Sequence, residues 1–438
     1  MRTRTLFTSL AVGLALVASA CSESTPTTAG TSTTTGTSAT ADCVPGPSVT
    51  SVIDCHITGS MLSSYMPAKP TKATGTPIQL GTINQDTGAT GAFPELTAAD
   101  KTAFDFINNE LGGVDGHPLV LTTCNTNFSP DLSQSCAQTM VSKKVVAVIG
   151  GIDVWGTGIA TLAENKVPLV GGIPVSFDSM RSPYSFQFSG GTWGAALGMS
   201  EYAVDTLKAK KIAIIYSEFP PITDSAKLAQ RAVARHGGTA VLISTPPIGA
   251  DMVAAINQAA STKPDAIVAL TADAGCVPTI RTAQQLQLTM PVMLTGACAA
   301  TKIVDELGPA IEGKVFNLEA ELDQTKPDNR MYRAIVERYG PKYNYQWQGA
   351  GTVSFRAVMN LYVQMRKIGA DKLSPATITA ALRAAHDEPS FFGHPYTCDG
   401  KQLDGYPSIC TAQQTLGKIS NAKIVPVTGW LDVAAWAR

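Results

Sequence analysis

The alternation of short apolar runs with helical stretches constrains the fold of this chain more than any other feature. Residues 145–149 read Val-Val-Ala-Val-Ile, and residues 266–270 read Ala-Ile-Val-Ala-Leu. Runs that are apolar throughout are typical of parallel strands buried on both faces. The stretches between such runs carry apolar residues at helical spacing, as in 96–111. The sequence therefore predicts an α/β fold of parallel sheets covered by helices.

The alternation occurs in two series, which predict two doubly wound parallel-sheet lobes. In the first series we expect strands at 78–83, 119–123, 145–149 and 167–170, with helices at 96–111, 130–141 and 157–164. In the second we expect strands at 211–216, 240–243, 266–270 and 291–294, with helices at 195–207, 224–236, 252–260 and 277–287. A late strand at 315–318 precedes helices at 329–339, 350–368 and 375–385 and a β-meander at 391–427.

The first residues of the chain are typical of an export signal. Arg2 and Arg4 precede an apolar stretch, and Val-Ala-Ser-Ala-Cys ends at Cys21. One interpretation is an ordinary cleaved signal with an incidental cysteine. The other is a lipoprotein signal, because the segment resembles a lipobox, which implies lipidation of Cys21 and anchoring at the outer face of the cell membrane. Residues 22–41, nearly all Ser, Thr, Ala, Gly and Pro, are interpreted as a tether.

Composition and motifs exclude several classes of function. The formal net charge is −1 and charged residues make up 15% of the chain, so no basic surface for nucleic acid is expected. No second apolar run is long enough to span a membrane. Neither Gly-x-Ser-x-Gly nor His-Glu-x-x-His is present, so we expect neither an enzyme nor a cofactor.

Eight cysteines remain after Cys21, and an even number in an exported chain predicts disulfides. A metal site is the alternative, but no Cys-x-x-Cys occurs and the five histidines are scattered. Eight cysteines allow 105 connectivities. Sequential pairing is attractive because three of the four resulting pairs share a separation of 12 residues: Cys43–Cys55, Cys124–Cys136, Cys276–Cys298 and Cys398–Cys410.

A set of short segments occurs in one order and spacing: 112–119 (Gly-Gly-Val-Asp-Gly-His-Pro-Leu), 145–150, 167–170, 210–215, 263–268 and 311–315. Together they resemble the type I periplasmic substrate-binding proteins, in the leucine/isoleucine/valine-binding branch. The resemblance covers about residues 76–431. It implies two lobes that are joined at a hinge by three crossovers and close over a ligand. One lobe would be 76–189 plus 317–388 and the other 190–316 plus 389–431. Residues 42–75 are then an added cysteine-containing extension, with a helix expected at 59–65.

The turn Gly-Gly-Ile-Asp-Val-Trp-Gly-Thr-Gly at 150–158 follows a predicted strand and raises the question of what it holds. It lacks a lysine, departs from Gly-x-Gly-x-x-Gly, and places Asp153 where a phosphate would be repelled, so it does not predict a nucleotide site. One alternative is a tight turn with Trp155 in the core. The resemblance instead places the turn at the ligand cleft.

The resemblance also indicates how the ligand differs from an amino acid. Groups that hold an α-carboxylate in the family are largely replaced by apolar residues such as Val154 and Ile173, and Thr295 begins the loop that would carry an ammonium-binding acid. Unpaired burial of those charges is costly, so we expect an apolar or aromatic ligand, with branched-chain amino acids less favoured. The candidate ligand contacts are Gln85, Asp86, Phe93, Asp153, Val154, Trp155, Val175, Ser176, Phe219, Asp273, Thr295 and Trp347.

The resemblance and the export signal together imply an extracytoplasmic solute-binding lipoprotein that captures a small organic molecule and delivers it to an ABC permease. A ligand sensor or a structural lipoprotein of the same fold is the alternative, because fold analogy alone does not separate these roles.

Overall fold

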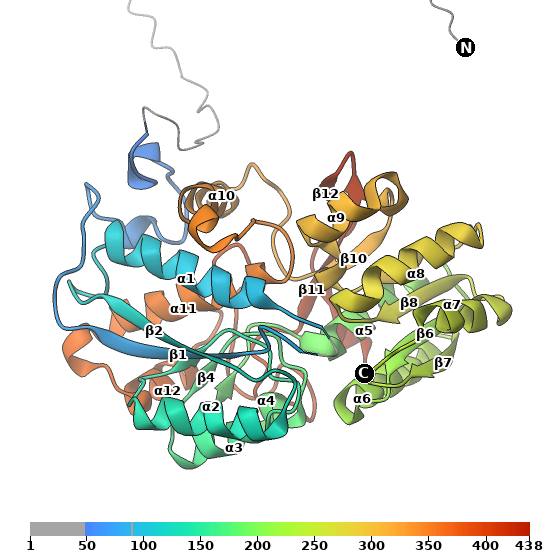
Figure 1. Ribbon diagram of the computed structural model, residues 1–438, viewed down its shortest axis with the longest axis horizontal. Helices are drawn as coiled ribbons and strands as arrows, with labels where there is room; N and C mark the ends of the chain where they lie inside the picture. Colours follow the sequence, from blue (N-terminus) through green and yellow to red (C-terminus); the bar gives the residue numbers. More distant parts are fainter. Residues whose placement is uncertain (1–48, 89–90) are drawn as a thin grey trace, which may run out of the picture. The chain divides into compact units, whose positions relative to one another are not determined.

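The computed structural model describes residues 49–88 and 91–438, which belong to one compact unit, Asp42–Arg438. The predicted signal, Cys21, the tether and Cys43 lie outside the described residues. Within this unit the strands form two separate sheets, each flanked by helices (Figure 1). The predicted two-lobed α/β architecture is therefore confirmed.

The first sheet has five parallel strands in the order β2-β1-β3-β4-β5, a doubly wound arrangement. Its strands are β1 (Ile78–Asn84), β2 (Leu119–Asn125), β3 (Val148–Ile149), β4 (Leu169–Val170) and β5 (Ser185–Phe186). The helices that alternate with them are α1 (Pro94–Asn109), α2 (Pro130–Ser142), α3 (Thr157–Glu164) and α4 (Phe177–Arg181).

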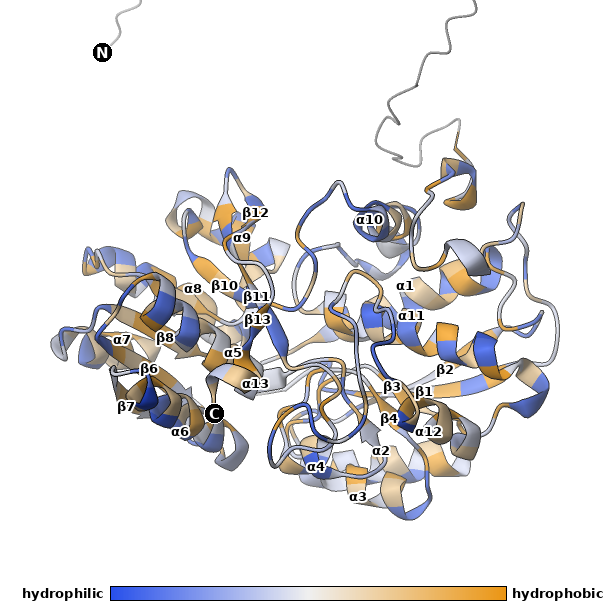
Figure 2. Cartoon of the chain, turned by 180° about the vertical axis from the view of Figure 1, so that it is seen from behind, coloured by the Kyte–Doolittle hydropathy of each residue, from blue (hydrophilic) through white to orange (hydrophobic). Residues whose placement is uncertain are grey.

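The second sheet has eight strands in the order β12-β11-β10-β9-β8-β6-β7, with β13 paired to β11. Strands β6 to β10 are parallel to one another, whereas β11, β12 and β13 pair antiparallel. The strands are β6 (Lys211–Ser217), β7 (Thr239–Thr245), β8 (Ala266–Leu270), β9 (Val292–Leu294), β10 (Val315–Leu318), β11 (Gln413–Ser420), β12 (Lys423–Pro426) and β13 (Leu431–Asp432). The helices are α5 (Gly191–Glu201), α6 (Pro220–Arg235), α7 (Met252–Ser261), α8 (Asp273–Gln285), α9 (Thr301–Leu307) and α13 (Val433–Trp436). Hydrophilic and hydrophobic residues mix along the outer helices, as expected where a helix buries one face (Figure 2).

The chain passes between the two lobes more than once. After β5 it enters α5, which packs on β8, β10 and β11 of the second sheet. After β10 it returns, because α10 (Pro327–Tyr339) and α11 (Gly351–Ile368) both pack on α1, and α12 (Pro375–Arg383) packs on α11. It then crosses again to reach β11. Phe391 and Tyr396 still pack in the hydrophobic core of the first lobe, while Ala412 belongs to the core of the second. The sequence-based division assigns residues 389–431 to the second lobe. Between residues 398 and 412 the chain contributes to both cores, because Cys398 and Cys410 pack in the first while Leu403, Tyr406 and Ile409 pack in the second.

Several predicted elements differ at their ends. Helices α1, α6 and α10 begin at Pro94, Pro220 and Pro327, two to four residues before the expected starts, because proline is well suited to the first helical turn. Within the strand expected at 145–149, only the two residues of β3 are in strand conformation. The helix expected at 195–207 is α5 followed by a π-helical turn, Tyr202–Thr206. Within the expected meander, residues 391–412 form no regular strand and the hairpin is β11–β12.

The N-terminal extension packs on the first lobe. The backbone N–H groups of Val52 and Ile53 donate to the carboxylate of Glu110 at 2.7 and 3.0 Å, and both side chains join the core that contains Phe106. In place of the helix expected at 59–65, the structure has a short 3₁₀ turn at Ser63–Tyr65. The extension is thus part of the folded unit from at least residue 52.

Disulfides join Cys124 to Cys136, Cys276 to Cys298 and Cys398 to Cys410, which confirms three of the sequential pairs. Cys55 is also disulfide-bonded, and its predicted partner Cys43 lies outside the described residues. Across residues 49–88 and 91–438, no group of three or more His, Cys, Asp and Glu side chains is arranged to hold a metal ion. Within the same residues, no helix combines the length and apolarity needed to cross a bilayer.

Candidate ligand-binding site

A cavity of about 360 Å³ lies where the carboxyl ends of strands from both sheets meet. Its lining includes residues that follow β1, β3 and β4 of the first sheet and residues that follow β6, β8, β9 and β10 of the second. The first turn of α11 completes the wall. Crevices beyond the carboxyl ends of parallel strands are where open α/β sheets bind ligands.

The cavity wall is mostly apolar and carries almost no charge. Phe93, Ile152, Val175, Phe219 and Leu270 are among the apolar residues that line it. Among the described lining residues none is lysine, arginine or histidine, and the one carboxylate is that of Glu319. Most of the lining hydroxyl groups already bond to the protein. An apolar cavity with few polar groups favours a ligand of the same character.

The turn at 150–158 shapes one side of this wall. Gly150 and Gly151 have φ values of 59° and 76°, and a Cβ added at Gly151 would lie 2.1 Å from the carbonyl oxygen of Ile83. Only glycine fits so close to the neighbouring backbone. The turn therefore brings Ile152 and Val154 into the cavity wall. Apolar side chains at these positions do not suit a phosphate.

Asp153 faces away from the cavity lining and fastens the turn. Its carboxylate accepts hydrogen bonds from the Ser133 hydroxyl at 2.5 Å and from the Gly156 N–H at 3.1 Å. Burial raises the pKa of Asp153, and these hydrogen bonds oppose the shift. Beneath the same turn, burial raises the pKa of Asp100 well above its usual range, and its carboxyl lies 2.6 Å from the hydroxyl oxygen of Thr82.

Six of the twelve predicted contacts line the cavity: Gln85, Phe93, Val154, Val175, Phe219 and Thr295. The structure does not bring the other six into the lining. Asp86 accepts hydrogen bonds from the side chains of Asn84 and Thr97, at 2.7 Å each. Ser176 caps the N-terminus of α4. Trp347 packs partly on the first core, with the Arg333 guanidinium 5.2 Å from its ring centre.

Trp155 and Asp273 lie beside the cavity and connect the two lobes. The ring of Trp155 meets that of Phe219 edge-on, with 5.3 Å between ring centres, and its indole N–H donates to the carbonyl of Phe128 at 3.0 Å. Asp273, at the start of α8, accepts a long 3.4 Å hydrogen bond from the Ala92 N–H and pairs with Lys302 at 3.2 Å. These residues join the lobes around the cavity.

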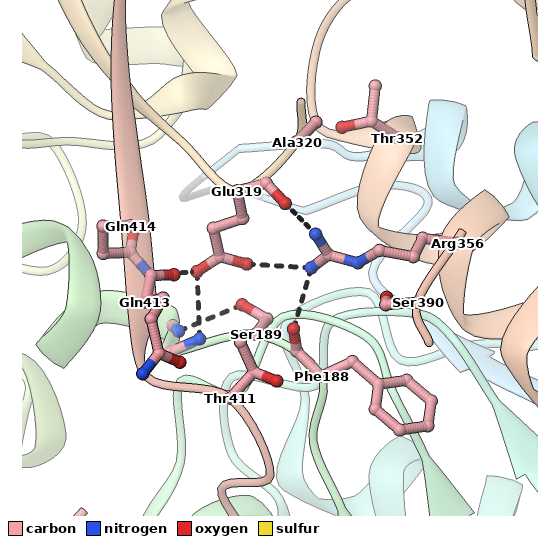
Figure 3. Close-up of polar contacts among 12 residues, drawn as sticks. Phe188, Ser189, Glu319, Ala320, Thr352, Arg356, Ser390, Thr411, Gln413 and Gln414 are labelled. Carbon is pink, nitrogen blue, oxygen red and sulfur yellow. Dashed lines mark hydrogen bonds and ion pairs between the residues drawn. The ribbon is translucent and has the colours of Figure 1, made fainter. Parts of the chain in front are cut away.

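The sequence-based selection missed the polar cluster at the hinge. Glu319 directly follows β10 and pairs with Arg356 on α11, and both side chains are almost fully buried (Figure 3). The missed lining residues also include Asn317 and Thr352. The strand-end rule that selected Gln85 applies equally to Glu319, because Glu319 follows a predicted strand, whereas the meeting with Arg356 depends on tertiary structure.

The Cys276–Cys298 disulfide holds two parts of the cavity wall together. It connects α8 to the loop after β9, and Gly275 and Ala297, the sequence neighbours of its cysteines, line the cavity. The bridge therefore fixes two loops of the cavity wall to each other.

A profile of the periplasmic binding protein family matches residues 77–408, about three quarters of the chain. The chain belongs to the periplasmic binding protein family. Its members are extracytoplasmic solute-binding proteins without enzymatic activity. A comparison with curated protein sequences gave no significant match.

This periplasmic binding protein also resembles solved structures of the same fold. A leucine-binding protein from Thermotoga maritima is 17% identical, with a TM-score of 0.64 over 80% of this chain and 98% of the other. A fatty acid ABC transporter substrate-binding protein from Thermomonospora curvata is 15% identical, with a TM-score of 0.70 over 86% and 97%. An ABC transporter solute-binding protein from Rhodopseudomonas palustris, solved with 3,4-dihydroxybenzoic acid, is 17% identical, with a TM-score of 0.68 over 82% and 98%. At these identities the likeness shows the fold, and it confirms the resemblance on which the two-lobed prediction rests.

Proposed function

We propose that this protein captures a small apolar or aromatic molecule in the cavity between its lobes and delivers it to an ABC permease. The observation that carries the proposal is the cavity of about 360 Å³, whose described lining holds no basic side chain and one acid. Its volume lies in the usual range for small-molecule sites. Transfer of apolar ligand surface from water to such a wall drives binding.

The same wall argues against branched-chain amino acids as ligands. An amino acid brings a carboxylate and an ammonium group, and each would need a partner once buried. Among the described lining residues the one carboxylate, Glu319, is already paired with Arg356. Structural neighbours named for a fatty acid or solved with a dihydroxybenzoic acid support a ligand with a large apolar part.

Capture by this mechanism depends on contacts with both lobes. A ligand in the cavity would touch Val175 of the first lobe and Leu270 of the second. Such a ligand stabilises the arrangement in which the two walls face each other, because it interacts more favourably with that state than with a separated one. A permease can then distinguish loaded from empty protein by the relative position of the lobes.

The proposal includes a lipid anchor at Cys21, followed by the tether at residues 22–41. An anchor would keep the folded unit at the membrane that holds the permease. Replacement of Cys21 by alanine should release the protein from the membrane fraction of the producing cells, while wild-type protein stays in it. Equal distribution of the two proteins would contradict the anchor and leave ligand capture standing.

Thermal denaturation against a ligand panel tests the capture itself. The panel holds aromatic compounds, fatty acids and alcohols, sterols, sugars and amino acids. A ligand at 100 times its Kd adds about 2.7 kcal/mol to stability, which is a readily measured rise in Tm. A rise with apolar or aromatic compounds supports the proposal. A rise with leucine or valine alone would contradict the proposed ligand class.

A further inference from the structure

Glu319 occupies an unusual place in the binding cavity. It follows β10 at the point where the chain leaves the second sheet, and it lines the cavity with 8% of its side chain exposed. Among the described lining residues it is the one that carries a formal charge. A ligand that reaches this part of the cavity therefore meets the carboxylate of a buried ion pair, with limited access to water.

The carboxylate of Glu319 is held in a fixed position by three donors (Figure 3). Its Oε1 accepts hydrogen bonds from the Gly190 N–H at 2.9 Å and from the Gln414 amide at 2.7 Å, and its Oε2 pairs with Arg356 at 3.3 Å. A carboxylate offers about four acceptor positions, so these contacts leave capacity for one further donor. The group is thus placed to accept a hydrogen bond from a ligand.

Both terminal nitrogens of Arg356 are occupied by contacts within the protein, and the residue does not line the cavity. Its Nη2 donates to the Phe188 carbonyl at 2.8 Å and pairs with Glu319, and its Nη1 contacts the Glu319 carbonyl. The residue is absent from the described cavity lining, and 3% of its side chain is exposed. An anionic ligand would therefore meet the carboxylate of Glu319 before the guanidinium behind it.

Other groups that could hold a carboxylate are also occupied. In the turns after β3 and β4, the N–H groups of Gly151, Ile152 and Ile173 donate to the Ser354 hydroxyl, the Asn84 side chain and the Gly151 carbonyl, at 2.9–3.0 Å. The Ser176 hydroxyl accepts from the Ser179 N–H at 3.2 Å in its helix cap. These groups therefore offer little to an anion.

We propose that Glu319 is a specificity-determining residue that rejects ligands with a carboxylate and accepts a hydrogen bond from an uncharged hydroxyl or amide group of the ligand. This inference rests on the proposed function of the cavity. Two like charges brought together in a poorly hydrated site repel strongly, whereas an O–H or N–H donor gains a charge-assisted hydrogen bond.

Matched ligand pairs test this inference. Each set shares one apolar group: benzoate with benzyl alcohol and benzamide, and octanoate with octanol and octanamide. Calorimetric titration of the purified protein at neutral pH gives their affinities. We expect the uncharged member of a set to bind on the order of a hundredfold more tightly than its carboxylate. A carboxylate that binds equally or more tightly would overturn the inference while it supports capture of apolar ligands. Absence of binding by every member would contradict the proposed function itself, and the inference with it.

Variants then assign the discrimination to Glu319. Glu319→Gln keeps the shape and removes the charge, so the affinity ratio within a pair should fall by about tenfold or more. Glu306→Gln, which removes a half-exposed carboxylate outside the cavity lining, is the matched control and should leave the ratio unchanged.

Thr352→Lys provides a test that leaves Glu319 in place. A lysine at this position adds a positive charge to the cavity, so it should strengthen binding of benzoate relative to benzyl alcohol. This variant keeps the inference testable if Glu319→Gln does not fold. An unchanged ratio in a folded Glu319→Gln protein would show that the carboxylate does not determine the specificity. An unchanged ratio in a folded Thr352→Lys protein would show that discrimination does not respond to charge in the cavity, and either result would overturn the inference.

Discussion

The side walls of the cavity and its floor at the hinge differ in polarity. The side walls are apolar, and the described residues that form them carry no charge. They are built from strand ends, such as those that present Val175 and Leu270. The floor, where the segments that contain Gly190, Glu319 and Gln414 pass between the lobes, holds a buried ion pair and a network of hydrogen bonds. Apolar walls can bind a ligand without orienting it, whereas a buried charge network has one satisfied arrangement. The floor thus supplies the directional contacts that the walls lack.

The largest expected effect comes from removal of the Arg356 guanidinium, the positive partner of Glu319. Arg356→Met leaves the buried Glu319 carboxylate without its charged partner, and loss of one member of a buried pair typically costs about 3–5 kcal/mol. Chemical denaturation of both proteins measures the loss. Arg281→Met is the control, because the Arg281–Glu306 pair is half exposed on both sides and should contribute about 1 kcal/mol or less. Equal losses of stability in the two variants would show that the buried pair contributes no more to folding than the half-exposed one.

The next largest effect concerns the stiffness of a side wall. Replacement of both Cys276 and Cys298 by alanine should cost about 3 kcal/mol through the larger entropy of the unfolded chain. It should also weaken ligand binding, because the bridged loops line the cavity.

The Cys398–Cys410 pair lies away from the cavity lining and is the matched control. Its removal should reduce stability without a change in ligand affinity, as measured by denaturation and titration of the same samples. An unaltered affinity in the Cys276/Cys298 variant would contradict the wall-stiffening role.

A third prediction concerns Glu95, in the first turn of α1 near Asp273 and Lys302. Burial raises the pKa of Glu95 to about 7 from 4.5, with smaller contributions from nearby charges. The folded protein therefore binds this proton more tightly than the unfolded chain, so the stabilisation is present below pH 4.5 and is lost as the pH rises to about 7. Burial also raises the pKa of Glu201 to about 7, which adds a loss in the same direction.

Comparison with Glu95→Gln isolates the contribution of Glu95. The variant lacks the ionisable group, so its Tm relative to wild type should increase as the pH rises from 4.5 to about 7. Melting curves of both proteins across this range measure the difference. A difference in Tm that stays constant with pH would contradict the raised pKa.

The smallest expected effect is at the aromatic contact between the lobes. Trp155 and Phe219 meet edge-on, and such pairs contribute about 0.5–1.5 kcal/mol beyond the area that they bury. A double-mutant cycle with Trp155→Ala and Phe219→Ala on ligand affinity should give a coupling of this size. The cycle removes the separate effect of Phe219 as a lining residue. Additive losses would show that the contact does not assist ligand capture.

The sequence predicted the parts of the fold that depend on long apolar runs. Strands β8 and β10 lie at the residues expected, because each is a continuous apolar or nearly apolar run between turn signals. The two-residue strands β3 to β5 were harder, since so short an element leaves little pattern. Helices α6 and α10 begin at Pro220 and Pro327, before the expected starts at 224 and 329, because proline suits the first helical turn.

The candidate site likewise has a part that the sequence predicted and a part that it did not. Strand-end reasoning found lining residues such as Gln85 and Phe93, because parallel strands present their carboxyl ends at one edge, and the family resemblance found Val154 and Thr295. It also selected Ser176 and Asp153, whose side chains serve a helix cap and a turn. The Glu319–Arg356 pair was missed because 37 residues separate its members and only the return of α11 to the first lobe brings them together.

A crystal structure of the complex with the tightest uncharged ligand of the matched pairs tests the central claim most directly. We expect the apolar part of the ligand between Val175 and Leu270, in contact with both lobes, and its hydroxyl or amide group within hydrogen-bond distance of the Glu319 carboxylate. A ligand bound outside the cavity, or one whose polar group faces the side walls while Glu319 has no contact with it, would contradict the account.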